Sequence, residues 1–179
     1  MRSGTGRSGG LRGAVLSASM ALGIVGLAAA PVALAEEPDF LALGAGVFDV
    51  FDDHTTAEFR AEYRSDIRFW KFAPFVGAMT NAEGAFYGYA GLGVDIFLGE
   101  RVVVTPNAGF GLYYDGDSKD LGGALEFRTG AEFAYCFTDR SRLGLAFNHI
   151  SNASIYDSNP GTESLVVMYA LPLGIGAPP

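Results

Sequence analysis

The feature that most constrains the fold of this chain is a strict alternation of apolar and charged residues. From Ala57 to Arg64, Ala, Phe, Ala and Tyr alternate with Glu, Arg, Glu and Arg. Successive side chains of a β-strand point to opposite faces, so one face of this segment suits lipid or a core and the other carries charges of both signs. Residues 124–137 repeat the pattern, with Glu126, Arg128 and Glu132 on the charged face.

The rest of the chain after residue 35 has the same β character, with 14 Phe, 8 Tyr and 25 Gly in the sequence. No apolar run there is long enough to cross a bilayer as a helix. A bilayer cannot hydrate open sheet edges, so strands that span it must close into a barrel. The sequence therefore predicts an all-β fold, an eight-stranded antiparallel up-and-down transmembrane β-barrel. The other six strands are expected at residues 39–52, 71–81, 84–98, 101–114, 141–152 and 162–173.

A barrel of eight strands is filled by its own side chains, so the charged faces are expected to form a plugged, nearly neutral interior. The residues assigned to it are Glu58, Arg60, Glu62, Arg64, Asp95, Arg101, Glu126, Arg128 and Glu132. The alternative is a soluble periplasmic barrel or sandwich with the two faces exchanged. The large aromatics on the apolar faces, and Phe69, Trp70 and Phe72 at a strand end, favour the membrane.

Residues 1–35 have the pattern of a cleaved signal peptide. Arginines in the first twelve residues precede an apolar run over 14–35, which ends in Ala33-Leu34-Ala35, an A-x-A cleavage pattern. Retention of this run as a membrane anchor is the alternative. The expected mature protein is residues 36–179, a single outer-membrane β-barrel domain of a bacterial cell.

Charge and cysteine content exclude several classes of partner. The formal net charge is −8, and the predicted leader contains arginines but no acid, so the mature chain is more acidic still. Nucleic acid is therefore not an expected partner. Cys136 is the only cysteine, which excludes an intrachain disulfide and a cysteine-rich metal site. His54 and the acidic residues around Gly116 are interpreted as solvated turns, and neither a metal nor another cofactor is expected.

Chain direction then fixes which connections face the cell exterior. With both termini in the periplasm, the connections near 52–56, 81–84, 115–120 and 153–161 are expected outside. The connections near 65–70, 98–101 and 138–141 are expected to be periplasmic turns.

A His, a Ser and a Glu are expected to meet at the outer end of the last two strands. His149 and Ser151 are two residues apart and share the parity of the lipid-facing residues. Polar groups that face hydrocarbon are costly, which calls for a functional explanation. Glu163 opens the neighbouring strand with outward parity, so the three residue types of a Ser-His-Glu hydrolase site would lie together. Candidate oxyanion donors are Asn159, Asn152 and the turn that ends at Gly161.

These residues resemble a known family. The run from His149 to Ser154, the turn Asn159-Pro160-Gly161, Glu163 and the segment 169–173 are similar to the lipid A 3-O-deacylases of Gram-negative outer membranes. That resemblance is strongest over residues 147–173. It implies an eight-stranded barrel whose triad lies on its outer surface near the outer leaflet.

The resemblance also implies a role for each matching residue. His149 would be the base, Ser151 the nucleophile, Glu163 the orienting acid and Asn159 the oxyanion donor. The expected activity is hydrolysis of the 3-O-linked acyl chain of lipid A, with lipopolysaccharide as substrate, outer-membrane lipids around the barrel and no cofactor.

Two other functions remain open at this point. One is a non-catalytic barrel that serves adhesion, resistance or envelope structure. The other is an enzyme that transfers an acyl chain between lipids by the same Ser-His chemistry. The sequence also leaves open whether two copies associate as a homodimer.

Overall fold

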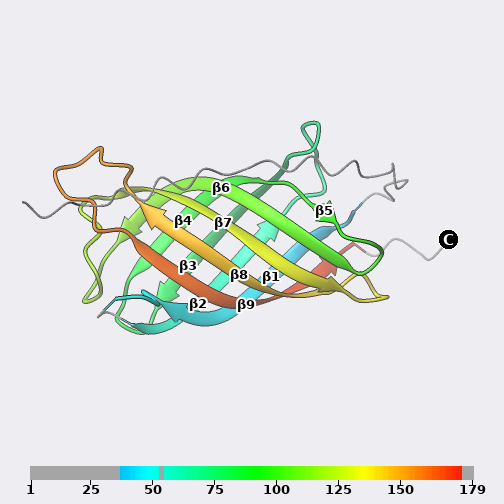
Figure 1. Cartoon of the computed structure of the whole chain (residues 1–179), viewed down its shortest axis with the longest axis horizontal. Helices are drawn as coiled ribbons and strands as arrows, with labels where there is room; N and C mark the ends of the chain where they lie inside the picture. The colour runs from blue at the N-terminus through cyan, green and yellow to red at the C-terminus, as the bar shows by residue number, and fades with distance from the viewer. Residues whose placement is uncertain (1–36, 53–54, 175–179) are drawn as a thin grey trace, which may run out of the picture. The chain divides into compact units, whose positions relative to one another are not determined.

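The strands of the computed structural model, which describes residues 37–52 and 55–174, form one closed antiparallel sheet (Figure 1). The strands are β1 (Asp39–Phe48), β2 (Thr56–Arg64), β3 (Ala73–Asn81), β4 (Phe86–Gly93), β5 (Ile96–Phe97), β6 (Val102–Tyr114), β7 (Leu125–Cys136), β8 (Arg142–Ser151) and β9 (Thr162–Leu173). Consecutive strands pair with each other except β4 and β5, which both pair with β6, and the pairing of β1 with β9 completes the ring. The predicted eight-stranded up-and-down barrel is confirmed.

The prediction of one continuous strand over 84–98 needs a correction, because the ladder breaks between β4 and β5. Val94 N donates to Pro106 O at 3.0 Å, but proline has no N–H to return the second bond of that pair. The register continues unchanged across the break, from Gly93 opposite Asn107 to Ile96 opposite Val104. β4 and β5 therefore occupy one strand position in the barrel.

The expected strand over 39–52 is also too long, because β1 ends at Phe48. Asp49 has a φ of 56°, a left-handed conformation that cannot continue a strand. The chain turns there into the β1–β2 connection.

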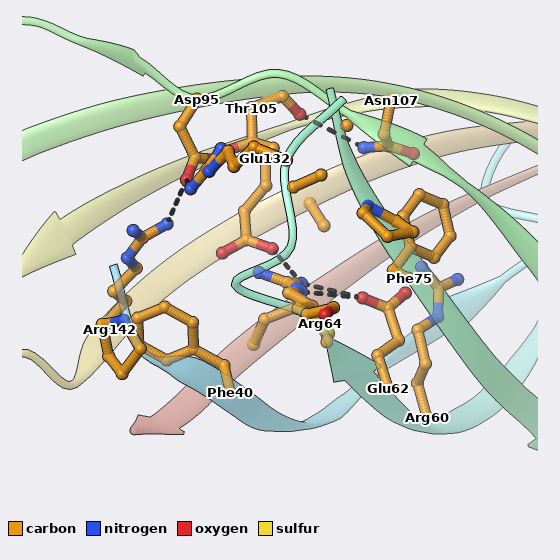
Figure 2. A pocket seen from close by; sticks show the side chains of 18 of the residues that line it. Phe40, Arg60, Glu62, Arg64, Phe75, Asp95, Thr105, Asn107, Glu132 and Arg142 are labelled. Carbon is orange, nitrogen blue, oxygen red and sulfur yellow. Dashed lines mark hydrogen bonds and ion pairs between the residues drawn. The ribbon is translucent and has the colours of Figure 1, made fainter. Parts of the chain in front are cut away.

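The barrel interior is a network of paired charges. Glu62 accepts hydrogen bonds from Arg64 (3.0 Å), Arg128 (3.1 Å) and Tyr89 (2.8 Å). Arg64 also donates to Glu132 at 2.6 Å, so its guanidinium joins carboxylates on two strands, as Figure 2 shows. Because each of these four charges faces an opposite one, this part of the interior can exclude bulk water without isolating a charge.

The predicted interior is confirmed with one exception. Glu58, Arg60, Glu62, Glu126, Arg128 and Glu132 are buried, and Arg64 and Asp95 are half-buried. Arg101 is exposed, because it lies in the turn before β6 begins at Val102. The Arg101 side chain has the parity of the inward residues, but it lies beyond the strand end and is therefore in solvent.

Arg142 at the start of β8 is an interior arginine that the sequence analysis did not assign. Its guanidinium donates to Asp95 at 3.2 Å and to Glu37 at 2.7 Å, and stacks 4.5 Å from the centre of the Phe40 ring. Phe40, Asp95 and Arg142 of this cluster line the pocket shown in Figure 2, at the end of the barrel that holds Asp39 and Leu173.

The outer face of the barrel is apolar. Its exposed side chains include Leu43, Phe59, Val76, Phe110, Phe133, Leu145 and Val167. The alternative with charges outside and aliphatic residues inside is therefore wrong. In the part of the chain that the structure describes, no helix is long and apolar enough to cross a membrane. The predicted leader, residues 1–35, and His54 lie outside the described residues.

Two interior glutamates give a test of this charge network. Glu62 has three polar partners, whereas neither carboxyl oxygen of the fully buried Glu126 finds one among the described residues. Glu62→Leu should lower the free energy of unfolding by about 3–5 kcal/mol, because it leaves buried arginines underpaired. Glu126→Leu should raise it by about 1 kcal/mol, because it removes a buried polar group without a partner.

Urea titration of the refolded barrel, followed by the folded band on unheated gels, measures both free energies. Equal destabilisation by the two substitutions would contradict the pairing described here.

Candidate functional site

His149 and Glu163 form a hydrogen-bonded pair on the lipid-facing wall of the barrel. They lie directly opposite each other on β8 and β9, and His149 Nδ1 is 2.9 Å from Glu163 Oε1. Their side chains are 43% and 27% exposed, so both remain accessible from outside the barrel. The pair lies at the end of the barrel opposite Asp39 and Leu173, where β8 ends and β9 begins.

Ser151 follows His149 on the same face of β8. Two residues of an extended strand place the Cα atoms about 7 Å apart. With Nδ1–H donated to Glu163, Nε2 of His149 is the nitrogen left to accept a proton. Among the described residues no hydrogen bond joins the Ser151 hydroxyl to this ring. Catalytic hydrogen bonds are often long in the absence of substrate and tighten in the complex.

Gly161 brings the last residues of the β8–β9 connection against both side chains. Its φ is +65°, and a Cβ at this position would lie 3.1 Å from His149 Cε1 and 3.7 Å from Ser151 Cβ. Only glycine combines this left-handed conformation with so close an approach at no steric cost. The turn that sequence analysis selected for its donors is therefore also a wall of the site.

The two candidate asparagines have different positions. Asn152 is fully buried, and its side-chain amide donates to Leu121 O (2.8 Å) and Ser158 O (2.7 Å). Both amide hydrogens are occupied, so Asn152 ties two loops together and is not available as an oxyanion donor, contrary to our expectation.

Asn159 is exposed above the site. Its Oδ1 accepts the backbone N–H of Asn152 at 3.0 Å, while its Nδ2 makes only a long 3.3 Å contact with Ser154 Oγ. The carbonyl oxygen thus holds the amide group in place and leaves the NH₂ group to act as a donor.

A network that sequence analysis missed supports the Glu163 end of the site. Val50 N donates to Glu163 O at 3.1 Å, and Thr162 Oγ1 donates to Asp49 Oδ1 at 2.9 Å. Lys119, from the β6–β7 connection, reaches across the barrel mouth to bond Asp49 and Asp52, each at 2.7 Å. Burial acts to lower the pKa of Lys119, but these hydrogen bonds outweigh it and raise the pKa. Nothing local in the sequence connects residues this far apart.

Aromatic side chains flank the site on both sides. Phe51 of the β1–β2 connection lies with its ring centre 6.2 Å from that of Phe147 on β8. On the other side, the Tyr156 ring packs against Gly123, and its hydroxyl accepts a hydrogen bond from Leu125 N at 3.2 Å. Two loops thus add aromatic side chains to the apolar wall near the His149–Glu163 pair.

A metal ion is bound in a protein by several His, Cys, Asp or Glu side chains together. Within residues 37–52 and 55–174, no group of three or more His, Cys, Asp or Glu side chains is arranged to hold a metal ion.

Fold and site together define a small outer-membrane β-barrel that carries a histidine, a serine and a carboxylate on its lipid-facing wall. A family model described as Lipid A 3-O-deacylase (PagL) matches residues 55–172. The chain belongs to this lipid A 3-O-deacylase family and is an outer-membrane protein.

Solved structures agree on the fold. The chain is similar to the outer membrane enzyme PagL, with a TM-score of 0.57, 18% identity, and coverage of 75% of this chain and 99% of that one. It is also similar to Neisserial surface protein A, with a TM-score of 0.60, 10% identity and coverage of 75% and 96%. A de novo designed transmembrane β-barrel gives a TM-score of 0.51 at 14% identity, with coverage of 77% and 98%. The search of curated protein sequences gives no significant match.

The close approach of Gly161 to the imidazole can be tested with a matched glycine. Gly161→Ala should displace the His149 ring, because the added Cβ would lie within 3.1 Å of it. Gly99→Ala introduces the same kind of strain, about 1 kcal/mol, at a φ of +77° with no atom within 4 Å. The imidazole NMR signals report the result, since the chain has two histidines. A His149 signal that moves equally in both variants would contradict the contact.

Proposed function

We propose that the protein is an esterase that hydrolyses the 3-O-linked acyl chain of lipid A with Ser151, His149 and Glu163. One observation carries this proposal. The His149–Glu163 hydrogen bond faces lipid, two residues along the strand from a serine. A polar pair in that position has no packing role that would offset the cost of facing hydrocarbon.

The reaction follows from the roles that these groups can take. Ser151 Oγ attacks the ester carbonyl carbon while His149 Nε2 accepts the hydroxyl proton. Glu163 holds the ring through Nδ1 and stabilises the imidazolium. The tetrahedral intermediate collapses as His149 returns the proton to the sugar oxygen that leaves. Water then attacks the acyl-serine with the same base, and the fatty acid is released.

The oxyanion of the tetrahedral intermediate needs a hydrogen-bond donor that is already in place. Asn159 Nδ2 is the side-chain donor best suited, since Asn159 Oδ1 is held by the N–H of Asn152. A donor fixed in this way reorganises little during the reaction, which is the basis of electrostatic stabilisation of the transition state.

The position of these residues suits a lipid substrate of the outer leaflet. The ester bonds of lipid A lie just beneath its sugar headgroup, and the proposed triad lies at the end of the barrel away from the termini. The outward residues Phe147 and Leu165, which are direct neighbours on β8 and β9, continue from the triad toward the bilayer centre. The cleaved chain can therefore lie along the barrel wall.

Single substitutions in the triad test the mechanism. Ser151→Ala and His149→Ala should each abolish release of 3-hydroxy fatty acid from purified lipid A in detergent, because each removes an indispensable part of one proton-transfer unit. Glu163→Ala should leave a residual rate, since nucleophile and base remain. Mass spectrometry of lipid A and of the released acid provides the measurement.

The exposed loop serine offers the matched control. Ser158→Ala should retain full activity, because the Ser158 contact with Asn152 uses the backbone carbonyl. Wild-type release by Ser151→Ala would refute the serine mechanism. No release from any ester-linked lipid by the wild type would favour the non-catalytic barrel, and appearance of the acyl chain on a second lipid would favour acyl transfer.

Asn159 allows a sharper test of the oxyanion role. Asn159→Asp keeps an oxygen to accept the Asn152 N–H but removes the NH₂ donor. We expect turnover to fall by about 100-fold or more, with the folded band on unheated gels unchanged. Asn159→Ala should cost a similar factor in turnover and also loosen the β8–β9 connection. Full activity of Asn159→Asp would assign the oxyanion to backbone donors.

A further inference from the structure

An exposed aromatic tip lies at the opposite end of the barrel from the candidate site. The β2–β3 connection, residues 65–72, leaves the barrel at the end that holds Asp39 and Leu173. Trp70 is 81% exposed, and Ile67, Phe69 and Phe72 are exposed as well. These residues lie beyond the membrane-spanning strands, so the barrel's own spanning surface does not account for them.

The tip is an ordered hairpin that presents its rings together. Phe69 and Phe72 exchange backbone hydrogen bonds of 2.9 and 3.1 Å across the turn. Trp70 adopts a φ of 61° between them, and its ring lies 6.0 Å from that of Phe72. A left-handed tryptophan is strained, so the turn holds this side chain outward at a cost in stability.

The base of the hairpin is fastened to the barrel. Ser65 N donates to Pro74 O at 3.0 Å, Asp66 N donates to Asp39 Oδ1 at 2.7 Å, and Arg68 donates to Asp95 at 3.3 Å. In Figure 1 the connection between β2 and β3 projects sideways from the barrel wall and does not continue along the barrel axis. A fixed sideways projection keeps the aromatic tip beside the barrel at the level of the strand ends.

We propose that this tip is a membrane anchor that inserts into the headgroup region of the periplasmic leaflet and binds glycerophospholipid there. The apolar tip is continuous with the lipid-facing wall through Tyr63 and Val76, outward residues of the strands that it joins. Tryptophan prefers the membrane interface, where its apolar ring is buried and its N–H can still find a polar partner.

Charge complementarity points to the same lipid. Lys71 is exposed, with its Nζ 5.4 Å from the centre of the Trp70 ring. Arg68 is paired with Asp95, which makes Lys71 the cation of the tip that is free to meet a phosphate. The ring and the ammonium group thus match the acyl ester region and the phosphate of a phospholipid. Anchored in this way, the barrel would keep a fixed depth in the bilayer.

Trp70 can report its own environment, because it is the single tryptophan of the chain. The full barrel is refolded into vesicles of phosphatidylethanolamine and phosphatidylglycerol, and preparations with heat-modifiable migration are used. We expect blue-shifted emission, protection from aqueous iodide, and stronger quenching by lipids brominated near the headgroup than by lipids brominated near the chain end.

A relocated tryptophan gives the matched control. In the double variant Trp70→Phe with Phe133→Trp, the ring lies on the outer face of β7 opposite Val104 and Leu145, within the membrane-spanning wall, so bromines near the chain end should quench it more strongly. Lys71→Glu should increase the access of the neutral quencher acrylamide to Trp70 in the same vesicles. Red-shifted Trp70 emission with free iodide access, beside a quenched Phe133→Trp control, would overturn the anchor. That result would indicate a tip that projects into the periplasm.

Discussion

Every other feature of this protein depends on the need to satisfy polar groups where water is absent. In the bilayer, backbone N–H and C=O groups must pair with one another, and a ring of strands without edges meets that need. The pairings between β1 and β9 and between β4 and β6 complete the ring. At Val94 and Pro106, proline withholds one donor from the ladder. The ladder breaks there, but the strand keeps its place because pairing resumes in the same register.

The same constraint explains the charged lumen. Eight strands leave too little space for a channel, so inward side chains must fill it, and charges of both signs can do so when they pair. Arg64 illustrates the result, since it bridges Glu62 on its own strand and Glu132 across the barrel. A rigid, filled interior of this kind frees the outer wall and the loops to carry function.

The candidate site draws on both the wall and the loops. Strand parity directs His149, Ser151 and Glu163 outward, while Gly161 and Asn159 belong to the connection above them. The Asp49–Lys119 contact and the hydrogen bond from Val50 to Glu163 link that region to two other loops. An enzyme of this family thus needs no cavity inside the barrel, because its lipid substrate lies in the membrane that surrounds the barrel wall.

The sequence by itself determined the strands, the closed barrel and the faces of most residues, because a period of two is a local property of each strand. It therefore located His149 and Ser151 on the lipid side and Glu62 and Arg128 inside. Only the tertiary structure decided which groups meet across the barrel or beyond a strand end. Parity assigned Arg101 to the interior, and Asn152 was a candidate oxyanion donor because it follows Ser151 in the sequence. The actual strand ends place Arg101 in solvent, and the packing of two loops occupies the Asn152 amide hydrogens. Such contacts depend on where strands stop and how loops fold over the mouth, which no local period encodes.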